Sequence, residues 1–150
     1  MLASDMKSLS DVRYEHALED LKAAELLLEK EQYKSAVNRS YYSIFHAIRA
    51  VLAYDDIDSK KHSGIISSFQ RLYIKTGIFN KEFSKIITDS FEIRSDSDYD
   101  DFYIISKDEV EEQLENSKKF IAEIEKFLNI NLLNSITYRK VLEFFLYILE

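Results

Sequence analysis

The residues best suited to chemistry in this 150-residue chain lie in two short segments. In the first, FEIRSDSDYDD (residues 91–101), Arg94 is followed by four aspartates within seven positions, with Tyr99 among them. Guanidinium groups pair well with phosphate and carboxylate groups. The segment therefore has three interpretations: a functional site, a cation-binding loop, or a polar helix end.

The second segment, NRSYYSIFHAIRA (residues 38–50), carries polar groups at helical spacing. Its members Arg39, Tyr42, His46 and Arg49 fall on one side of a helix, opposite the apolar stripe. Arginines there suit phosphate recognition, and an imidazole suits proton transfer near neutral pH. The alternative is a semi-polar face that pairs with acidic neighbours, such as those on the preceding helix. A further histidine, His62, begins another predicted helix beside two lysines, where a surface or capping role is the usual one.

The acidic segment matches a calcium-binding loop poorly. Asp96, Asp98 and Asp100 stand at the first, third and fifth positions, where the helix–loop–helix motif has carboxylate ligands. The sixth position, which should be glycine for the sharp turn, is Asp101. The twelfth, which should be a bidentate glutamate, is Lys107. Because both discriminating positions fail, we expect no metal site here.

The composition favours an all-α fold. Proline is absent and glycine occurs only at positions 64 and 77, although the tight turns of β-rich folds usually need these residues. The net charge of −7 disfavours nonspecific adhesion to nucleic acid but allows a local basic cleft. There is no cysteine, no apparent signal peptide and no apolar stretch near the roughly 20 residues that span a bilayer. We therefore expect a cytoplasmic protein without a membrane segment.

Apolar residues recur with a period of about 3.6 and predict five helices in an antiparallel up-and-down bundle. Ser10 is expected to cap the first helix, and Gly77 to end the third in a left-handed conformation. A capping box formed by Ser106 and Glu109 marks the start of the fifth. The predicted helices cover approximately residues 11–30, 33–54, 62–75, 80–94 and 106–128.

The C-terminal segment, residues 129–150, is much more apolar than the preceding bundle, residues 10–128. Residues 141–149 are hydrophobic nearly all round. An apolar segment left in water is an aggregation hazard. We therefore expect a C-terminal apolar helix that docks either on the bundle or on a second subunit.

Three motifs in this order resemble the small prokaryotic HEPN proteins. They are N-R-x-Y-Y-x-x-F-H from residue 38, K-x-H-S-G from residue 60 and R-x-x-x-D-Y-D-D from residue 94. The similarity extends over residues 10–128 and so covers most of the chain. It implies a helical bundle that forms homodimers, often beside a small nucleotidyltransferase as a toxin–antitoxin pair. Active members of the family cleave RNA without a metal or cofactor, using an arginine and a histidine near the dimer cleft.

The resemblance also implies where such a site lies. Arg94 matches the family arginine, but Tyr99 stands in the place of the histidine. Tyrosine, with an unperturbed pKa of about 10, is a poor base near neutral pH, so His46 or His62 would have to supply proton transfer. The neighbouring aspartates would repel RNA unless they are neutralised. The expected catalytic residues are Arg94, Tyr99 and His46, and the expected nucleotide- or RNA-binding residues are Asn38, Arg39, Tyr42, Arg49, His62 and Asp98.

Three functions are compatible with these features. The first is a HEPN-type module that is the toxin-like partner of a small nucleotidyltransferase and binds or acts on RNA or nucleotide at a dimer cleft. The second is a noncatalytic nucleotide-binding or interaction module with a degenerate ribonuclease motif, which Tyr99 and the net negative charge favour. The third is a structural dimerisation domain with the apolar tail as its interface. The first two depend on whether Arg94 and the histidines converge in the folded chain.

Overall fold

The chain folds into α-helices, with no strand among the residues that the structure describes. The computed structural model describes the backbone of residues 2–149 and the side chains of residues 2–129 and 140–149. Two short helical turns, η1 (Ala53–Asp55) and η2 (Gln70–Ile74), directly follow α2 and α3. The all-α fold expected from the sequence is thereby confirmed. The helices are α1 (Ala3–Glu29), α2 (Tyr33–Leu52), α3 (His62–Phe69), α4 (Glu82–Tyr99) and α5 (Lys107–Leu149).

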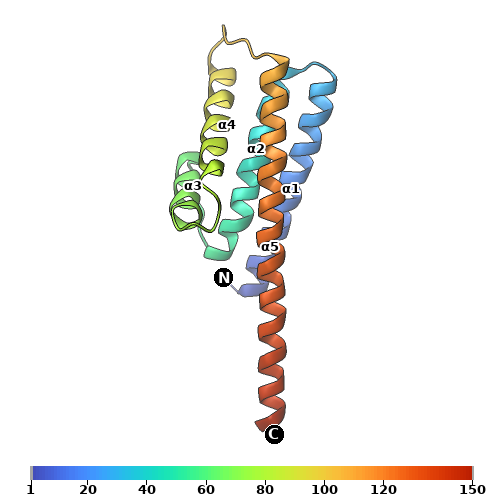
Figure 1. Cartoon of the computed structure of the whole chain (residues 1–150), viewed down its shortest axis with the longest axis vertical. Helices are drawn as coiled ribbons and strands as arrows, with labels where there is room; N and C mark the ends of the chain where they lie inside the picture. The colour runs from blue at the N-terminus through green and yellow to red at the C-terminus, as the bar shows by residue number, and fades with distance from the viewer. Residues whose placement is uncertain (1, 150) are drawn as a thin grey trace.

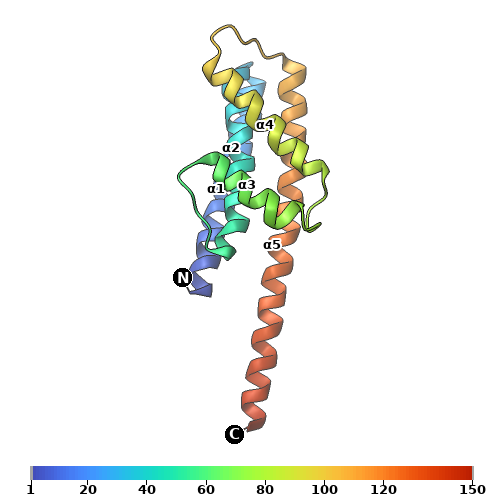
Figure 2. The same ribbon diagram turned by 90° about the vertical axis from the view of Figure 1, so that its left-hand side faces the viewer.

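Helix α2 lies at the centre of the bundle, where it contacts all four other helices. Figure 1 shows α1, α2 and α5 side by side, with α3 and α4 packed on one side of them. The view in Figure 2 shows α4 lying obliquely across the bundle. Only residues 30–32 separate α1 from α2, so the two helices run antiparallel. One side of α2 therefore faces α1, and another faces α3 and α4.

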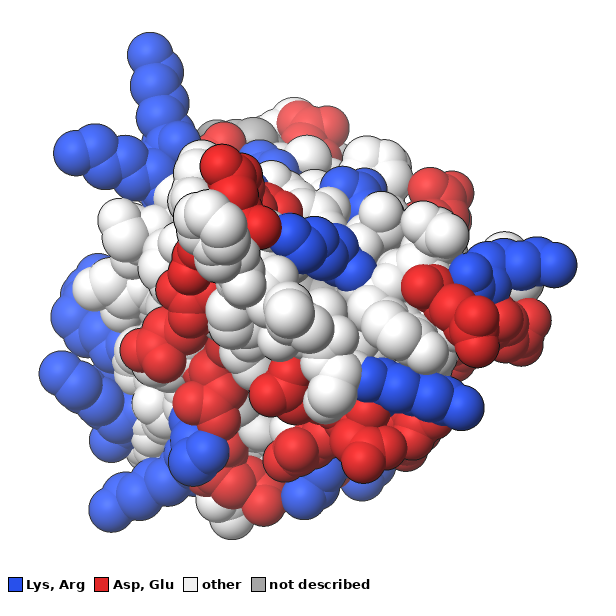
Figure 3. Space-filling model, turned by 90° about the horizontal axis from the view of Figure 1, so that it is seen from above, with Lys and Arg blue, Asp and Glu red and all other residues white. Residues whose placement is uncertain are grey.

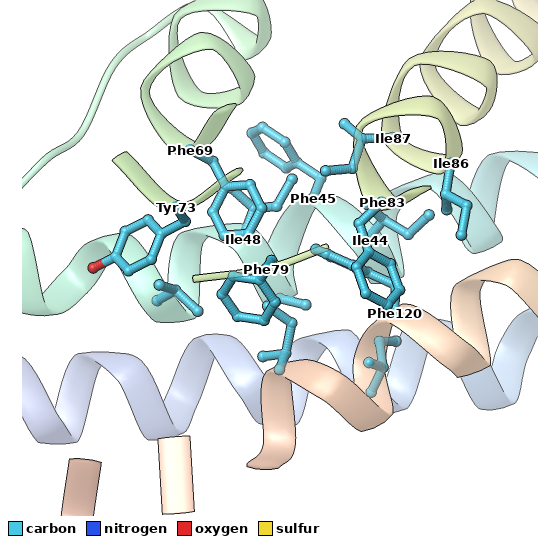
Figure 4. Close-up of a cluster of buried hydrophobic side chains, with 14 of the residues drawn as sticks. Ile44, Phe45, Ile48, Phe69, Tyr73, Phe79, Phe83, Ile86, Ile87 and Phe120 are labelled. Carbon is cyan, nitrogen blue, oxygen red and sulfur yellow. The ribbon is translucent and has the colours of Figure 1, made fainter. Parts of the chain in front are cut away.

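The apolar stripe of α2 forms the middle of the core. Large aromatic side chains from the neighbouring elements surround it (Figure 4). The ring centroid of Phe120 on α5 lies 5.8 Å from that of Phe69 on α3 and 5.6 Å from that of Phe83 on α4. These contacts hold α3 and α4 against α5. The stripe predicted for α2 is buried throughout and comprises Val37, Tyr41, Ile44, Ile48 and Val51.

Two helix ends differ from those predicted. Helix α1 begins at Ala3, and Ser10 is fully buried inside it instead of capping its start. No glycine or proline interrupts the preceding residues, and an ion pair of 2.6 Å between Lys7 and Asp11, four positions apart, supports the early turns. Helix α4 continues past Arg94 to Tyr99, so the acidic segment is the end of this helix and does not interrupt it.

Two other predicted helix ends are confirmed. Gly77 has a φ of 82° and its N–H donates to the carbonyl oxygen of Ile74, 3.0 Å away, which closes the turn after η2. At the start of α5, the N–H of Ser106 donates to a Glu109 carboxylate oxygen at 3.1 Å. The N–H of Glu109 donates in return to the Ser106 hydroxyl oxygen at 3.2 Å. This reciprocal pair is the capping box that the sequence predicts.

The apolar C-terminal segment is helical, but it is the continuation of α5 and not a separate helix. Figure 1 shows α5 running well beyond the other helices. Every residue from Lys140 to Leu149 is exposed, so this part of the segment does not dock on its own bundle. None of the helices, within the residues described, is both long and apolar enough to cross a membrane.

Candidate functional site

Arg94 on α4 lies directly against the polar side of α2. Its Nη2 donates a hydrogen bond of 3.1 Å to the hydroxyl oxygen of Tyr42. The central carbon of the guanidinium lies 5.2 Å from the ring centroid of Tyr41 and 5.4 Å from that of Tyr42, so the cation also contacts two aromatic rings. Its side chain is only 15% exposed. Packing on two rigid rings holds the guanidinium in one place before any ligand arrives.

Asp98, one helical turn after Arg94, supplies the counter-charge. Its Oδ2 lies 2.9 Å from Nε of Arg94, although the N–H of Nε is not aligned for a hydrogen bond. The contact is therefore an ion pair without a well-aligned hydrogen bond. Nδ2 of Asn38 on α2 donates to the same oxygen at 3.3 Å. A surface hollow of about 480 Å³ opens beside this group, and its lining includes Lys34, Asn38, Arg39 and Asp98.

His46 lies one helical turn after Tyr42 on α2. Its ring centroid is 6.0 Å from that of Tyr42, and its Nε2 lies 3.5 Å from a carboxylate oxygen of Asp20 on α1. Burial lowers the pKa of His46, and the opposing effect of the Asp20 charge is smaller. Its Nδ1 is buried without a hydrogen-bond partner. The imidazole is therefore neutral near pH 7.

His62, the first residue of α3, contacts the same pair of tyrosines. Its Nδ1 is 2.8 Å from the hydroxyl oxygen of Tyr41, and its ring centroid lies 5.8 Å from that of Tyr42. Burial lowers the pKa of His62, and the positive charges of Arg94 and Arg49 lower it further. Arg94 and His62 thus contact both tyrosines, and His46 contacts Tyr42. Residues from three helices therefore share the Tyr42 ring, while their role as a site stays a prediction.

Both arginines of α2 form ion pairs with carboxylates. Arg39 forms an ion pair of 3.1 Å with Asp20, and its guanidinium carbon lies 5.0 Å from the Tyr42 ring centroid. Arg49 lies 3.4 Å from a carboxylate oxygen of Asp58 in the loop before α3. The semi-polar interpretation of α2, in which its cations pair with acidic residues of the first helix, is thus correct for Arg39. We call the group of Asn38, Arg39, Tyr42, His46, His62, Arg94 and Asp98 the Arg94–Tyr42 face.

Two charged residues that pair with residues of α2 or with their partners were not foreseen from the sequence. Asp20 is shared by Arg39 and His46, and no motif singles it out on α1. Arg13 is buried, donates to the carbonyl oxygen of Arg49 at 3.0 Å and lies 3.6 Å from Asp58. Burial lowers the pKa of Arg13, and the neighbouring Arg49 adds to this effect. The one sequence signal for Asp20 and Arg13 is that each is a charged residue at a position of α1 that faces α2.

Tyr99 lies apart from the Arg94–Tyr42 face. It is the last residue of α4 and is 78% exposed. Successive residues of an α-helix are rotated by about 100°, so a residue five positions after Arg94 points about 140° away from it. Among the described contacts, none joins Tyr99 to Arg94 or to either histidine of the face. A catalytic role for Tyr99 stays a prediction.

Comparison with known proteins identifies the family. The HEPN domain model matches residues 10–127. The chain belongs to the HEPN domain family. It is 37% identical to a UPF0332 protein of Thermotoga maritima over 112 residues, 75% of this chain and 85% of the relative. It is also 34% identical to the protein named "Putative toxin MJ0142" of Methanocaldococcus jannaschii, over 80% of this chain and 87% of the relative. A second protein of that organism, "Putative toxin MJ0605", is 32% identical over 85% of this chain and 95% of the relative.

The face that this HEPN chain presents combines two guanidinium groups with aromatic side chains. Guanidinium groups held on aromatic rings have N–H donors of the kind that pair with phosphate oxygens. Each arginine already faces an aspartate, so a phosphate group would share or replace these partners. No group of three or more His, Asp or Glu side chains that could hold a metal ion occurs among the described residues. The end of the bundle seen in Figure 3 carries acidic and basic side chains intermixed.

Proposed function

We propose that this HEPN-domain protein binds RNA or a nucleotide at the Arg94–Tyr42 face, as a homodimer and as the toxin-like partner of a small nucleotidyltransferase. One observation carries the proposal: Arg94 is fixed against Tyr42, and His46 and His62 pack around the same ring. The hollow next to Asp98 gives a phosphate or a base room to approach. Two relatives, "Putative toxin MJ0142" and "Putative toxin MJ0605", support the toxin-like role.

The physical support for nucleic-acid binding is the pairing of cations with aromatic rings. Arg39 and Arg94 lie 5.0 and 5.4 Å from the Tyr42 ring centroid, so the ring holds both cations in place before a ligand arrives. The arginines add charge-assisted hydrogen bonds to phosphates. The aspartates at the face reduce its net positive charge, so affinity should depend on these specific contacts more than on a broad electrostatic field.

Binding of short single-stranded RNA oligonucleotides to the purified protein tests this function. We expect a fluorescence anisotropy change that saturates at low salt and weakens as salt rises, because phosphate contacts release counterions. A mononucleotide titration by calorimetry distinguishes nucleotide from RNA binding. No signal with either class of ligand at low salt would remove nucleic acid from the proposal.

Metal-independent RNA cleavage is the second candidate function. The observation that favours it is the neutral imidazole of His46, which packs on the same Tyr42 ring as Arg94, since a neutral imidazole can accept the proton of a ribose 2′-hydroxyl. Gel analysis of diverse RNAs incubated with the protein in EDTA tests it. If the RNA stays intact with both the wild-type protein and the Arg94→Ala variant, cleavage is eliminated as a function and only the binding proposal is left.

The toxin-like role and the partner can be tested in cells. We expect the neighbouring gene to encode a small nucleotidyltransferase, induced expression of the chain to slow bacterial growth, and coexpression of that nucleotidyltransferase to restore growth. Pull-down of that protein by the purified chain would support direct association. A neighbouring gene of another class, together with unimpaired growth, would count against this part of the proposal.

Self-association is expected to involve the C-terminal part of α5. Large apolar side chains there, among them Phe145 (58% exposed) and Leu146 (62% exposed), are left open by their own bundle, so a second copy of the same segment is the partner that we propose for them. Light scattering should give about twice the 17.7 kDa mass of one chain. The double variant Phe145→Glu/Leu146→Glu should shift this to one chain, because burying two charges in an apolar interface is unfavourable.

The control for this experiment is Leu26→Glu, which makes the leucine-to-glutamate part of the change at an exposed position on α1 (53% exposed). This variant should keep the wild-type mass. A dimer that persists in the double variant would remove the tail from the interface.

A further inference from the structure

The hydroxyl group of Tyr41 has one hydrogen-bond partner in the described part of the chain, the imidazole of His62. The distance from Oη to Nδ1 is 2.8 Å. Tyr41 is 1% exposed, so bulk water cannot accept a hydrogen bond from its hydroxyl group. A buried O–H without an acceptor loses its hydrogen bonds to water and gains nothing in return. The hydroxyl is therefore the donor, and Nδ1 of His62 is the acceptor.

This direction fixes the tautomer of His62. An imidazole that accepts at Nδ1 carries its proton on Nε2. In the opposite arrangement Nδ1–H would donate to the phenol oxygen, and the phenol proton would be left in the core without an acceptor. The ring cannot easily turn to avoid this choice, because it stacks on Phe45 with a centroid distance of 4.1 Å.

The other nitrogen of His62 is available to a ligand. Nε2 makes no hydrogen bond within the part of the protein that the structure describes, and it is not among the buried side-chain atoms that lack a partner. It is therefore open to solvent. His62 also begins α3, where the positive end of the helix dipole disfavours an imidazolium. Burial and the charge of Arg94 act in the same direction and lower its pKa.

We propose that Tyr41 is a positioning residue that holds His62 as an Nε2–H donor toward a phosphate oxygen of RNA bound at the Arg94–Tyr42 face. The inference rests on the proposed RNA-binding function and assigns His62 a role in it. A general base needs an unprotonated nitrogen facing the reacting proton, and in this tautomer the solvent-facing nitrogen is protonated. His62 is thus a binding group, and His46 is the histidine left for proton transfer.

The tautomer can be read directly without any ligand. The chain contains three histidines, so long-range ¹H–¹⁵N correlation spectra of the ring nitrogens at pH 7.5 are simple, and the signals lost in His62→Gln identify His62. We expect the pattern of the Nε2–H tautomer in the wild type and a mixture of tautomers in Tyr41→Phe. An Nδ1–H pattern in the wild type, or the same pattern in both proteins, would overturn the role of Tyr41.

RNA affinity then tests the role of the donor. Glutamine carries an amide N–H donor close to the position of Nε2–H, so His62→Gln should bind RNA about as well as the wild type. His62→Ala, which has no donor, should bind roughly 2- to 10-fold more weakly, and Tyr41→Phe should lie between them. Equal losses in His62→Gln and His62→Ala would overturn the donor role.

The two measurements separate the inference from the function on which it rests. Absence of RNA binding by the wild type would overturn both the proposed function and the ligand assigned to His62, while the spectra would still decide the tautomer. RNA binding by the wild type together with an Nδ1–H pattern would overturn only the inference about Tyr41 and His62.

Discussion

Arg94→Ala is expected to weaken RNA binding by roughly 10- to 100-fold, because a hydrogen bond to a charged group contributes about 1.5–3 kcal/mol and each 1.4 kcal/mol is a factor of about ten. The guanidinium is fixed by Tyr42 and by the two tyrosine rings, so little conformational freedom is lost when it meets a phosphate. Fluorescence anisotropy with one RNA at one fixed salt concentration measures the change. Arg94→Lys should lose less, since it keeps the charge but not the planar fork.

The matched control is Arg71→Ala, which removes the same charge from an exposed arginine on η2. It should leave affinity near the wild-type value. Loss of Arg94 also removes a side chain that is only 15% exposed, with its ion pair to Asp98 and its packing on Tyr41 and Tyr42, so Arg94→Ala should be less stable than Arg71→Ala, and affinities are compared at a temperature where both variants are folded. Thermal unfolding of each variant checks this. Equal losses of affinity in Arg94→Ala and Arg71→Ala would mean that only net charge matters and would reject the Arg94–Tyr42 face.

The secondary structure was predictable wherever a strong local signal exists. The apolar period of α2 defines both its length and its buried side, and the capping box at Ser106 defines the start of α5. The start of α1 was not predictable, because its first residues are polar and nothing in them stops a helix. The end of α4 was misjudged for a related reason. A cluster of aspartates suggests a loop, but on the exposed side of a helix their charges stay in water and Asp98 pairs with Arg94.

The composition of the face was largely predictable, but its geometry was not. Arg94 and Tyr42 are 52 positions apart, and their contact depends on how α4 is rotated about its axis against α2. A single sequence does not determine how α4 is rotated against α2. The same limit applies to Tyr41, which belongs to the apolar stripe by its spacing yet contacts both Arg94 and His62. Helical periodicity assigns a residue to one side of a helix, whereas a large aromatic residue can have its ring in the core and its hydroxyl at the site.

The core offers the largest expected effect on stability. We expect Phe120→Ala to lower the free energy of unfolding by about 3–5 kcal/mol, because truncating a buried phenylalanine removes apolar burial and leaves a cavity. Phe120 is fully buried and contacts Phe69 and Phe83, so its loss loosens α5 from both α3 and α4. Domains of this size are usually stable by only about 5–15 kcal/mol. Urea unfolding followed by circular dichroism measures the shift.

Phe102→Ala is the control, because it makes the identical change at a side chain that is 92% exposed, in the loop between α4 and α5. It should change stability by less than about 0.5 kcal/mol. The contrast separates burial from any intrinsic effect of replacing phenylalanine with alanine. Since Phe120 lies outside the Arg94–Tyr42 face, folded Phe120→Ala at low temperature should still bind RNA. Similar midpoints for the two variants would mean that the packing of α5 against α3 and α4 contributes little to the stability of the bundle.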